Sequence, residues 1–357
     1  MINIKELLKE NAPKIDKIIE KYIPREFTEK SAEFVFGKAS YKYNLEALTK
    51  AVSVPVWDML DRGGKRWRPA LFMLIIEALG GEFEKFSDFV VIPEVIHNGT
   101  LMKDDIEDGS EERRGEKCTH IKFGIDIAVN AGDVMFFTPM IVLQKNKDKI
   151  SNETSLKIYE TFVNDMNCLG IGQGSDIAWH KGMANADNIS EEEYLQMCAN
   201  KTGCLARMSA RIAAILAGGS EEQVEKIGKL AETIGVAFQI QDDILNLIES
   251  GVSKTKGGLG EDITEGKRTL MVIHTLGKAE DKDRERLIEI LEMHTSEQEK
   301  REEAILILKK YDSINYSKEF ARKMVKGAWE EVDAVFKESE AKEKLKAFAD
   351  FLVERDI

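Results

Sequence analysis

Proline is scarce in this sequence and absent after residue 139. The chain has 357 residues but only six prolines, and Pro139 is the last of them. An internal proline removes a backbone hydrogen bond and clashes with the preceding helical turn, so its absence permits long uninterrupted helices over residues 140–357. Sustained alternation of apolar and polar residues, the pattern of a half-buried strand, is also lacking. These absences predict an all-α fold.

A net positive charge is lacking as well, since the formal net charge at pH 7 is −13. Proteins that bind nucleic acids present a basic surface to the phosphates, so we expect no nucleic-acid partner. The negative charge would also disfavour an anionic ligand, unless bound cations reverse the sign locally. An anion site must therefore be identified from local motifs.

Paired cysteines and long apolar runs are missing too. The four cysteines have no CxxC or other zinc-type spacing, which indicates reduced structural thiols and not a metal site. No stretch reaches about 18 consecutive apolar residues, as a membrane-spanning helix requires. The N-terminal segment MINIKELLKENAPK contains no apolar run that could serve as a signal. We expect a cytoplasmic protein without a membrane span.

Helical patterns recur along the chain, separated by Gly, Ser and Asn. The middle segments are apolar over wide arcs, which is typical of helices inside a bundle. We predict one all-α domain over residues 1–357, a bundle of about 10–14 helices around a central apolar cavity, with outer helices over 280–357. The expected helices cover residues 3–22, 41–61, 67–80, 86–107, 124–146, 152–181, 191–217, 221–249, 262–277, 280–293 and 317–338.

The first motif that carries chemistry is MKDDIEDGSEERRG, residues 102–115. Asp104 and Asp108 are four residues apart and share one helix face, with Asp105 beside them. Hard divalent cations prefer such oxygen ligands, and magnesium takes one or two carboxylates together with substrate phosphates. The C-terminal dipole of the helix also disfavours these acids unless a cation is bound. A solvated acidic helix end is the alternative interpretation.

A similar pattern occurs in FQIQDDILN, residues 238–246, as Asp242, Asp243 and Asn246. The surrounding helix is apolar, and paired carboxylates within such a helix are hard to explain by solvation. Because an amide oxygen is a weaker cation ligand than a carboxylate, this second cluster depends mainly on Asp242. Two unrelated acidic patches are the alternative.

Basic residues surround the acidic motifs in the sequence. The loop GGKRWRP, residues 63–69, concentrates positive charge before a helix, and Arg113 and Arg114 follow the aspartates of the first motif. Guanidinium groups offer forked donors that suit phosphate oxygens. The triplet 201–203, Lys-Thr-Gly, interrupts an apolar helix, where Gly can loosen the helix beside a ligand. Surface turns, a helix junction and ordinary surface lysines are the alternatives.

These motifs, taken in order with GQGSDIAW (residues 172–179) and EDITEGK (261–267), resemble the trans-isoprenyl diphosphate synthase family. The resemblance covers about residues 60–275 and is strongest to geranylgeranyl diphosphate synthases. It implies an Mg²⁺-dependent prenyltransferase that joins isopentenyl diphosphate head-to-tail to an allylic diphosphate, and it implies a homodimer. Another class I terpenoid enzyme and a non-catalytic regulatory subunit of a prenyl synthase remain as alternatives.

The resemblance also implies roles for individual residues. Three magnesium ions would bind to Asp104, Asp108 and Asp242. The catalytic residues would be Asp104, Asp105, Asp108, Lys201, Asp242 and Asp243. The allylic diphosphate would be held by Arg113, Lys201, Thr202, Gln239, Lys256 and Lys267. Isopentenyl diphosphate would be held by Gly64, Lys65, Arg68, His97 and Arg114.

Product length depends on what blocks the chain about one helical turn, 5.4 Å, below the first acids. Gly99 and Thr100 lie five and four residues before Asp104. In short-chain members of the family one of these positions is often aromatic, and here neither is. We therefore expect a product of at least twenty carbons.

Overall fold

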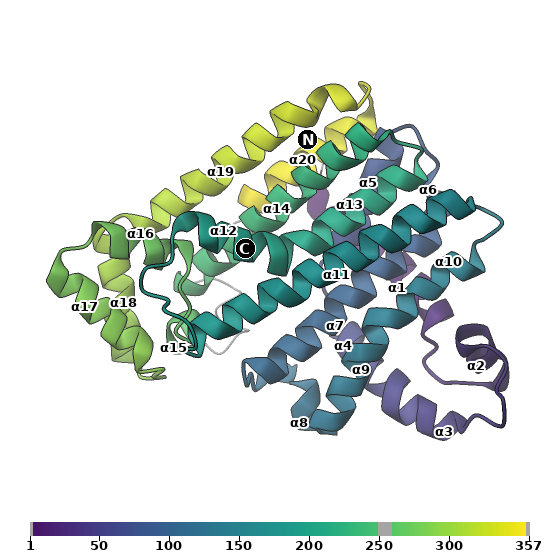
Figure 1. The fold of residues 1–357 in the computed structure, drawn as a ribbon, viewed down its shortest axis with the longest axis horizontal. Coiled ribbons are helices and arrows are strands. Elements are labelled where there is room, and N and C mark those ends of the chain that lie inside the picture. Colours follow the sequence, from purple (N-terminus) through teal and green to yellow (C-terminus); the bar gives the residue numbers. More distant parts are fainter. Residues whose placement is uncertain (1–2, 249–258, 355–357) are drawn as a thin grey trace. The chain divides into compact units, whose positions relative to one another are not determined.

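The computed structural model describes residues 3–248 and 259–354. Helices dominate these ranges (Figure 1). Extended structure within them is limited to one short antiparallel pair, β1 (Glu112–Arg113) and β2 (Glu116–Lys117). The predicted all-α fold class is confirmed. The central apolar cavity stays a prediction.

The chain divides into two compact units that interleave in sequence. Unit 1 comprises Met1–Thr161, Ser209–Val224 and Lys337–Leu345, and unit 2 comprises Phe162–Met208, Glu225–Phe336 and Lys346–Ile357. Four helices have residues in both units: α11 (Asn152–His180), α13 (Cys204–Leu216), α14 (Glu221–Leu247) and α20 (Glu340–Glu354). The single domain expected over residues 1–357 stays a prediction.

Unit 1 is organised around α7, which packs against α1, α4, α5, α8 and α9. Helix α5 is apolar all round and is buried on every side, as expected for a core helix. The helices of this unit are α1 (Ile4–Tyr22), α2 (Glu29–Phe36), α3 (Leu45–Leu48), α4 (Val54–Asp61), α5 (Trp67–Ala78), α6 (Phe83–Phe86), α7 (Val91–Glu107), α8 (Thr119–Phe123), α9 (Ile125–Phe137) and α10 (Ile141–Lys145).

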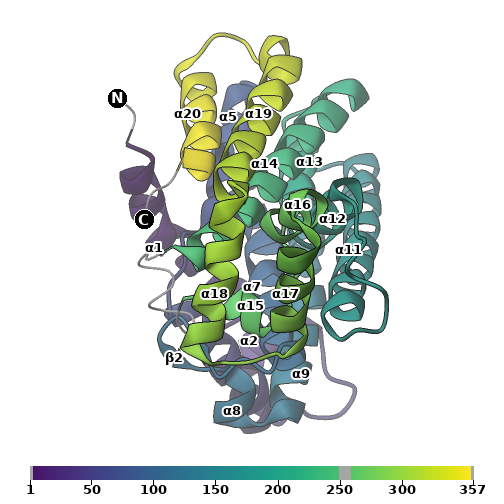
Figure 2. The same cartoon turned by 90° about the vertical axis from the view of Figure 1, so that its left-hand side faces the viewer.

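Unit 2 has the most buried stretch of α14 in its core, between Ile227 and Leu247. Helix α16 packs against α12, α17, α18 and α19, and α15 contacts both α17 and α18 (Figure 2). The remaining helices of this unit are α12 (Glu191–Cys198), α15 (Glu261–Thr264), α16 (Leu270–Lys278), α17 (Asp281–Glu292), α18 (Gln298–Lys310) and α19 (Ser313–Val332).

One stretch, Ile125–Lys145, is long and apolar enough to cross a membrane by length and composition. Core helices often pass the same test. This stretch is not one α-helix, because the 3₁₀ turn Thr138–Met140 separates α9 from α10. Ala128, Gly132 and Met135 are buried on α9, which packs against α7, and Val142 and Leu143 are buried on α10. The stretch is therefore weak evidence for a membrane span.

Most predicted helices agree with the structure, including 3–22 with α1, 67–80 with α5 and 152–181 with α11. The helix expected over 41–61 begins four residues later, at Leu45. Helices α2 and α8 and the β1–β2 pair were not predicted. The four cysteines all lie in the described ranges, and none of them forms a disulfide there.

Candidate active site

The basic loop follows α4 and turns sharply before α5. Its backbone has positive φ at Gly63 (81°), Gly64 (144°) and Arg66 (47°). Glycine adopts positive φ without strain, whereas this conformation is unfavourable for Arg66, which has a Cβ. Arg66 is buried, and its guanidinium lies 2.8 Å from Glu94 Oε1 and 3.0 Å from Asp16 Oδ1. Arg66 therefore anchors the loop to the core and leaves Gly64 exposed for a ligand.

Positive charge gathers around His97 on α7. Burial lowers the pKa of His97 well below 6.5, and the nearby cations Arg68, Arg114, Arg66 and Arg113 lower it further. The imidazole is therefore neutral at pH 7. The buried Arg68 lies over the Trp67 ring, 4.4 Å from its centroid, and Lys65 is exposed on the loop. Such a concentration of cations in a partly buried site favours an anionic ligand.

The acids at the end of α7 are not equivalent. Asp105 is buried and accepts a hydrogen bond of 2.7 Å from Arg113 Nε. Asp104 and Asp108 are partly exposed, with Asp104 Oδ2 3.8 Å from Arg113 Nη2. Two carboxylates are thus partly accessible, and the third holds Arg113 in place. The predicted role of Arg113 in binding a diphosphate stays a prediction.

A β-hairpin returns Arg114 toward the basic loop. Arg114 (φ 56°) and Gly115 (φ 77°) form the two-residue turn between β1 and β2, with the two positive φ angles of a type I′ turn. The Arg114 guanidinium donates to Gly63 O, and its Nη2 would lie 3.1 Å from a Cβ at Gly64. Burial lowers the pKa of Arg114 to about 10, and neighbouring cations contribute to this shift.

The predicted chain-length positions lie in different surroundings. Gly99 packs tightly against α9, because a Cβ placed there would approach Met135 Cβ to 2.9 Å and the Phe136 ring to 3.2 Å. Thr100 is partly exposed, and its hydroxyl donates to His97 O at 2.7 Å. A large side chain is therefore accommodated more easily at Thr100 than at Gly99. The role of both positions in product length stays a prediction.

Lys103 is directed away from the neighbouring acids. Its Nζ lies 2.6 Å from Asp133 Oδ1 on α9 and 5.3 Å from the Phe136 ring centroid. Its side-chain stem passes over Gly132, where a Cβ would lie 2.9 Å from Lys103 Cγ. The lysine therefore links α7 to α9, and its ammonium is paired with Asp133.

Unit 2 carries Lys201 and Thr202 in a π-helical segment, Ala199–Gly203, between α12 and α13. Such π-bulges in helices are frequent at functional sites. Two glycines allow neighbouring helices to pass close to it: a Cβ at Gly172 would meet Lys201 N at 2.4 Å, and one at Gly235 would meet Gly203 Cα at 2.8 Å. The loosened helix expected around Gly203 is therefore observed as a π-helical segment.

Each close approach places a polar side chain beside the π-helical segment one turn later. Asp176, four residues after Gly172, has Oδ2 at 2.6 Å from Lys201 Nζ. Gln239, four residues after Gly235, accepts a hydrogen bond of 2.9 Å from the Thr202 hydroxyl. Asp176 belongs to the GQGSDIAW motif, but the sequence indicated no role for it individually.

The second acidic motif also contains acids in different environments. Asp242 is partly exposed, whereas Asp243 is buried. Asp243 accepts hydrogen bonds of 2.8 Å from Tyr194 Oη and from Gln239 Nε2. Burial raises the pKa of Asp243 to about 7, and the negative charge of Asp262 adds to the shift. Tyr194 was not predicted as a site residue.

A cavity of about 50 Å³ is lined by Tyr194, Gln239 and Asp243 together with Lys267. Lys267 Nζ lies 3.6 Å from Asp262 Oδ1 and also pairs with Glu265. This small cavity brings together five of the predicted unit 2 residues: Lys201, Thr202, Gln239, Asp243 and Lys267. The predicted site residue Lys256 lies outside the described residues.

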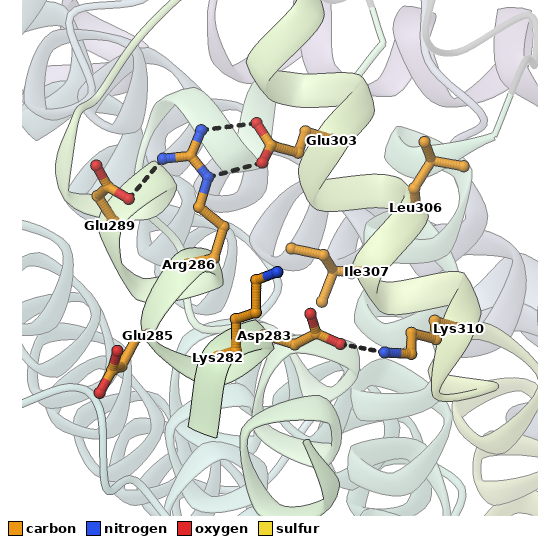
Figure 3. A pocket seen from close by; sticks show the side chains of 9 residues that line it. All are labelled: Lys282, Asp283, Glu285, Arg286, Glu289, Glu303, Leu306, Ile307 and Lys310. Atoms are coloured by element: carbon orange, nitrogen blue, oxygen red, sulfur yellow. Dashed lines mark hydrogen bonds and ion pairs between the residues drawn. The ribbon is translucent and has the colours of Figure 1, made fainter. Parts of the chain in front are cut away.

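A larger cavity of about 550 Å³ lies between α17 and α18 (Figure 3). Its main charges are already paired: Arg286 makes two bonds of 2.7 Å to Glu303, and Lys310 lies 2.6 Å from Asp283. The paired charges leave little net attraction for an anion. The motif residues therefore stay the candidate site, in preference to this cavity.

The donor groups fit magnesium. Within the described ranges no cluster of three or more His, Cys, Asp or Glu forms a closed metal site. Magnesium needs no such cluster, because it binds through one or two carboxylates and completes its shell with water and substrate phosphates. Asp104 and Asp108 offer two part-exposed carboxylates, and the buried Asp105 Oδ2 has no hydrogen-bond partner.

An all-α fold with two Asp-rich helix segments and basic loops is that of an isoprenoid synthase. The polyprenyl synthetase family model matches residues 49–308, so the chain belongs to this family, a family of prenyltransferases. Its members generally use Mg²⁺. The sequence-based assignment to the isoprenyl diphosphate synthases is thus confirmed.

Individual relatives agree with this family. The chain is 36% identical over 298 residues to a short chain isoprenyl diphosphate synthase of Methanothermobacter thermautotrophicus, covering 84% of this chain and 88% of that one. It is 31% identical over 316 residues to a geranylgeranyl diphosphate synthase of Saccharolobus solfataricus, covering 88% and 92%. The structure of geranylgeranyl pyrophosphate synthetase from Pyrococcus horikoshii superimposes with a TM-score of 0.83 at 31% identity, covering 99% and 98%.

Proposed function

We propose that this chain condenses isopentenyl diphosphate head-to-tail with an allylic diphosphate. Each new double bond has trans geometry, and the product has twenty or more carbons. We propose geranylgeranyl diphosphate as the product, because two of the similar proteins are named as synthases of it. The observation that supports the proposal most strongly is on α7. Within about three turns this helix and its C-cap carry the neutral His97, set among arginines, and the part-exposed acids Asp104 and Asp108.

The residues of unit 1 suit the binding of isopentenyl diphosphate, the substrate whose C–O bond to the diphosphate stays intact. Lys65, Arg68, His97 and Arg114 would bind the isopentenyl diphosphate, with Gly64 allowing the phosphates to approach the backbone. A neutral His97 can donate one hydrogen bond without the cost of charging next to guanidinium groups. These roles follow the family resemblance and the gathering of cations around His97.

The residues of unit 2 suit the leaving diphosphate of the allylic substrate. Lys201, Thr202, Gln239 and Lys267 would hold it, and Lys256 is proposed on the resemblance alone. Asp104 and Asp108 in unit 1 and Asp242 in unit 2 would hold Mg²⁺ together with the diphosphate, and we propose three ions. When bound, Mg²⁺ neutralises negative charge that develops on the departing diphosphate.

The reaction needs no protein nucleophile. The allylic C–O bond breaks, and its electron pair leaves with the diphosphate, which the lysines and amide donors stabilise. The double bond of isopentenyl diphosphate then forms the new C–C bond to the allylic cation. A proton leaves the resulting tertiary cation for the released diphosphate. The apolar core helices exclude water, which would otherwise capture the cation.

We also propose a homodimer that forms through apolar side chains of unit 1. Ile125 and Phe137 on α9 and Leu156 on α11 are each more than half exposed, and large exposed apolar side chains are candidates for a protein interface. Phe137→Glu should shift the mass measured by sedimentation from two chains toward one. A mass of two chains that this substitution leaves unchanged would contradict the proposed interface. The cytoplasmic location stays a prediction.

The proposed function is tested by supplying isopentenyl diphosphate with primers of five, ten or fifteen carbons, with Mg²⁺ or with a chelator. We expect elongation that requires Mg²⁺ and stops at twenty carbons or beyond, as measured by mass spectrometry of the products. Asp104→Asn and Asp242→Asn should each reduce the rate by at least about 100-fold, because each removes a charge that acts in the transition state. Absence of elongation with every primer would instead favour the regulatory-subunit alternative.

A further inference from the structure

A chain of three hydrogen bonds connects the core of unit 2 to the π-helical segment. Tyr194 Oη donates to Asp243 Oδ2 at 2.8 Å, and Gln239 Nε2 donates to Asp243 Oδ1 at 2.8 Å. The Thr202 hydroxyl donates to Gln239 Oε1 at 2.9 Å. Three of these side chains belong to motifs with proposed roles, and Tyr194 does not. All four line the same small cavity.

The direction of each bond follows from Tyr194. A phenol donates one hydrogen bond and an ionised carboxylate only accepts, so in the ionised state of Asp243 the bond runs from the Tyr194 hydroxyl to Asp243 Oδ2. It fixes the rotation of the Asp243 carboxylate, whose second oxygen then receives the Gln239 NH₂ group. The amide oxygen of Gln239 is thereby turned toward Thr202. One N–H of Gln239 stays directed away from Asp243 and is available for a ligand oxygen.

The position of Tyr194 is well determined by its helix. Helix α12 begins with a capping box, in which Ser190 and Glu193 satisfy each other's backbone N–H groups. Tyr194 follows directly and is 2% exposed. It lies seven residues, about two helical turns, before Lys201, and the π-helical segment continues directly from α12. A phenylalanine would fill the same space without the hydroxyl.

We propose that Tyr194 is a positioning residue for the allylic substrate: its hydroxyl fixes Asp243, which orients Gln239 and Thr202 toward the diphosphate. Tyr194 itself does not touch the substrate. The proposal rests on the prenyltransferase function proposed above, because that function names the ligand of Gln239 and Thr202. It assigns Asp243 to the same network of hydrogen bonds, in contrast to the part-exposed Asp242.

The test compares Tyr194→Phe with a matched control, Tyr316→Phe. Tyr316 also donates to a carboxylate on α12, Glu191 Oε2 at 2.7 Å, but it has no part in the proposed site. Steady-state rates give the KM of each substrate, and calorimetry with inorganic diphosphate and Mg²⁺ reports binding without turnover. Thermal unfolding without ligands reports the structural effect of each substitution.

We expect Tyr194→Phe to raise the KM for the allylic diphosphate about tenfold, as for the loss of one hydrogen bond to a charged group. The KM for isopentenyl diphosphate should change less than about twofold, since its proposed ligands are other residues. Tyr316→Phe should leave both KM values unchanged. Affinity for inorganic diphosphate should fall in Tyr194→Phe and not in Tyr316→Phe.

A double-mutant cycle tests whether Tyr194 acts through Gln239. In a Gln239→Ala background, Tyr194→Phe should have little further effect on the allylic KM, because the group it orients is gone. Full additivity would overturn the proposal, as would an equal rise in both KM values. So would a lowered unfolding midpoint without any change in KM. If the unmodified chain elongates no primer, the proposed function fails instead, and calorimetry still measures the effect on diphosphate affinity.

Discussion

Asn246 Oδ1 accepts a hydrogen bond from the backbone N–H of Asp262 at 3.1 Å. The backbone carbonyl of Asn246 also accepts from Gly260 N, at 2.9 Å. The last residue of the second acidic motif therefore joins the end of α14 to the start of α15. An acceptor oxygen is all that this role needs, which explains why an amide can stand where a carboxylate is commoner. This connection also helps to position Lys267, which follows α15 and lines the small cavity of unit 2.

Substitution of Asn246 tests this role. Asn246→Leu removes the acceptor and should lower the free energy of unfolding by about 1–3 kcal/mol, because the Asp262 N–H loses its partner. Asn246→Asp keeps an acceptor but adds negative charge near Asp243 and Asp262, so its loss of stability should shrink when Mg²⁺ and inorganic diphosphate are added. Chemical denaturation with and without these additions measures both. An Asn246→Leu protein as stable as the parent would rule the role out.

Removal of Arg113 should destabilise the fold independently of catalysis. Asp105 is almost fully buried, and its charge is paired with Arg113. Arg113→Met would leave a buried unpaired carboxylate, so we expect a loss of about 3 kcal/mol in the free energy of unfolding. The control is Arg322→Met, which breaks an exposed pair with Glu319 and should change stability little. Similar losses in both variants would contradict a structural role for Asp105.

Product length should respond to Thr100 more cleanly than to Gly99. Thr100→Tyr places an aromatic ring one turn below the acids and should shift products from twenty carbons toward fifteen, with stability nearly unchanged. Gly99→Phe should instead destabilise the protein by about 1–3 kcal/mol, because Met135 and Phe136 already fill the space. Mass spectrometry of products and thermal unfolding separate the two effects. An unchanged product from Thr100→Tyr would exclude this position as the determinant.

Protonation of His97 should destabilise the ligand-free protein as the pH falls. Its pKa is lowered in the folded state by burial and by the surrounding arginines, so below about pH 6.5 the unfolded chain binds a proton that the folded chain does not. Stability should then decline by up to about 1.4 kcal/mol per pH unit relative to His97→Gln. Denaturation of both proteins between pH 7.5 and 5.5, in buffer without phosphate, measures the difference. Parallel curves would refute the assignment of a neutral imidazole.

The sequence predicted most of the helices, although not α2 or α8, and it could not show the partners of the motif residues. Apolar periodicity predicted α1, α5 and α11 because each buries a continuous face or its whole surface. In EEEYLQMC, Tyr194 has the pattern of an ordinary core tyrosine. Its bond to Asp243 joins residues 49 positions apart, and no local pattern encodes such a pairing.

The β1–β2 hairpin was missed for a related reason. Its strands have two residues each, too few for any alternation to be recognised, and its turn contains Arg114-Gly115 where Asn-Gly is the usual signal. Lys103 had no explanation in the sequence either. Its partner Asp133 lies on α9, thirty residues away, so only the packing of α7 against α9 reveals the ion pair.

The left-handed backbone at Arg114 lowers the stability of the fold, while the arginine side chain serves the proposed binding of an anion. An L-residue in this conformation is disfavoured by roughly 1–2 kcal/mol relative to glycine, and the Arg114 side chain is further held near other cations. Variants selected only for resistance to heat should therefore accumulate glycine at position 114. Variants selected for prenyl transfer should retain arginine there. Parallel laboratory evolution under the two regimes would show at this single codon how much stability the enzyme forgoes in order to bind an anion.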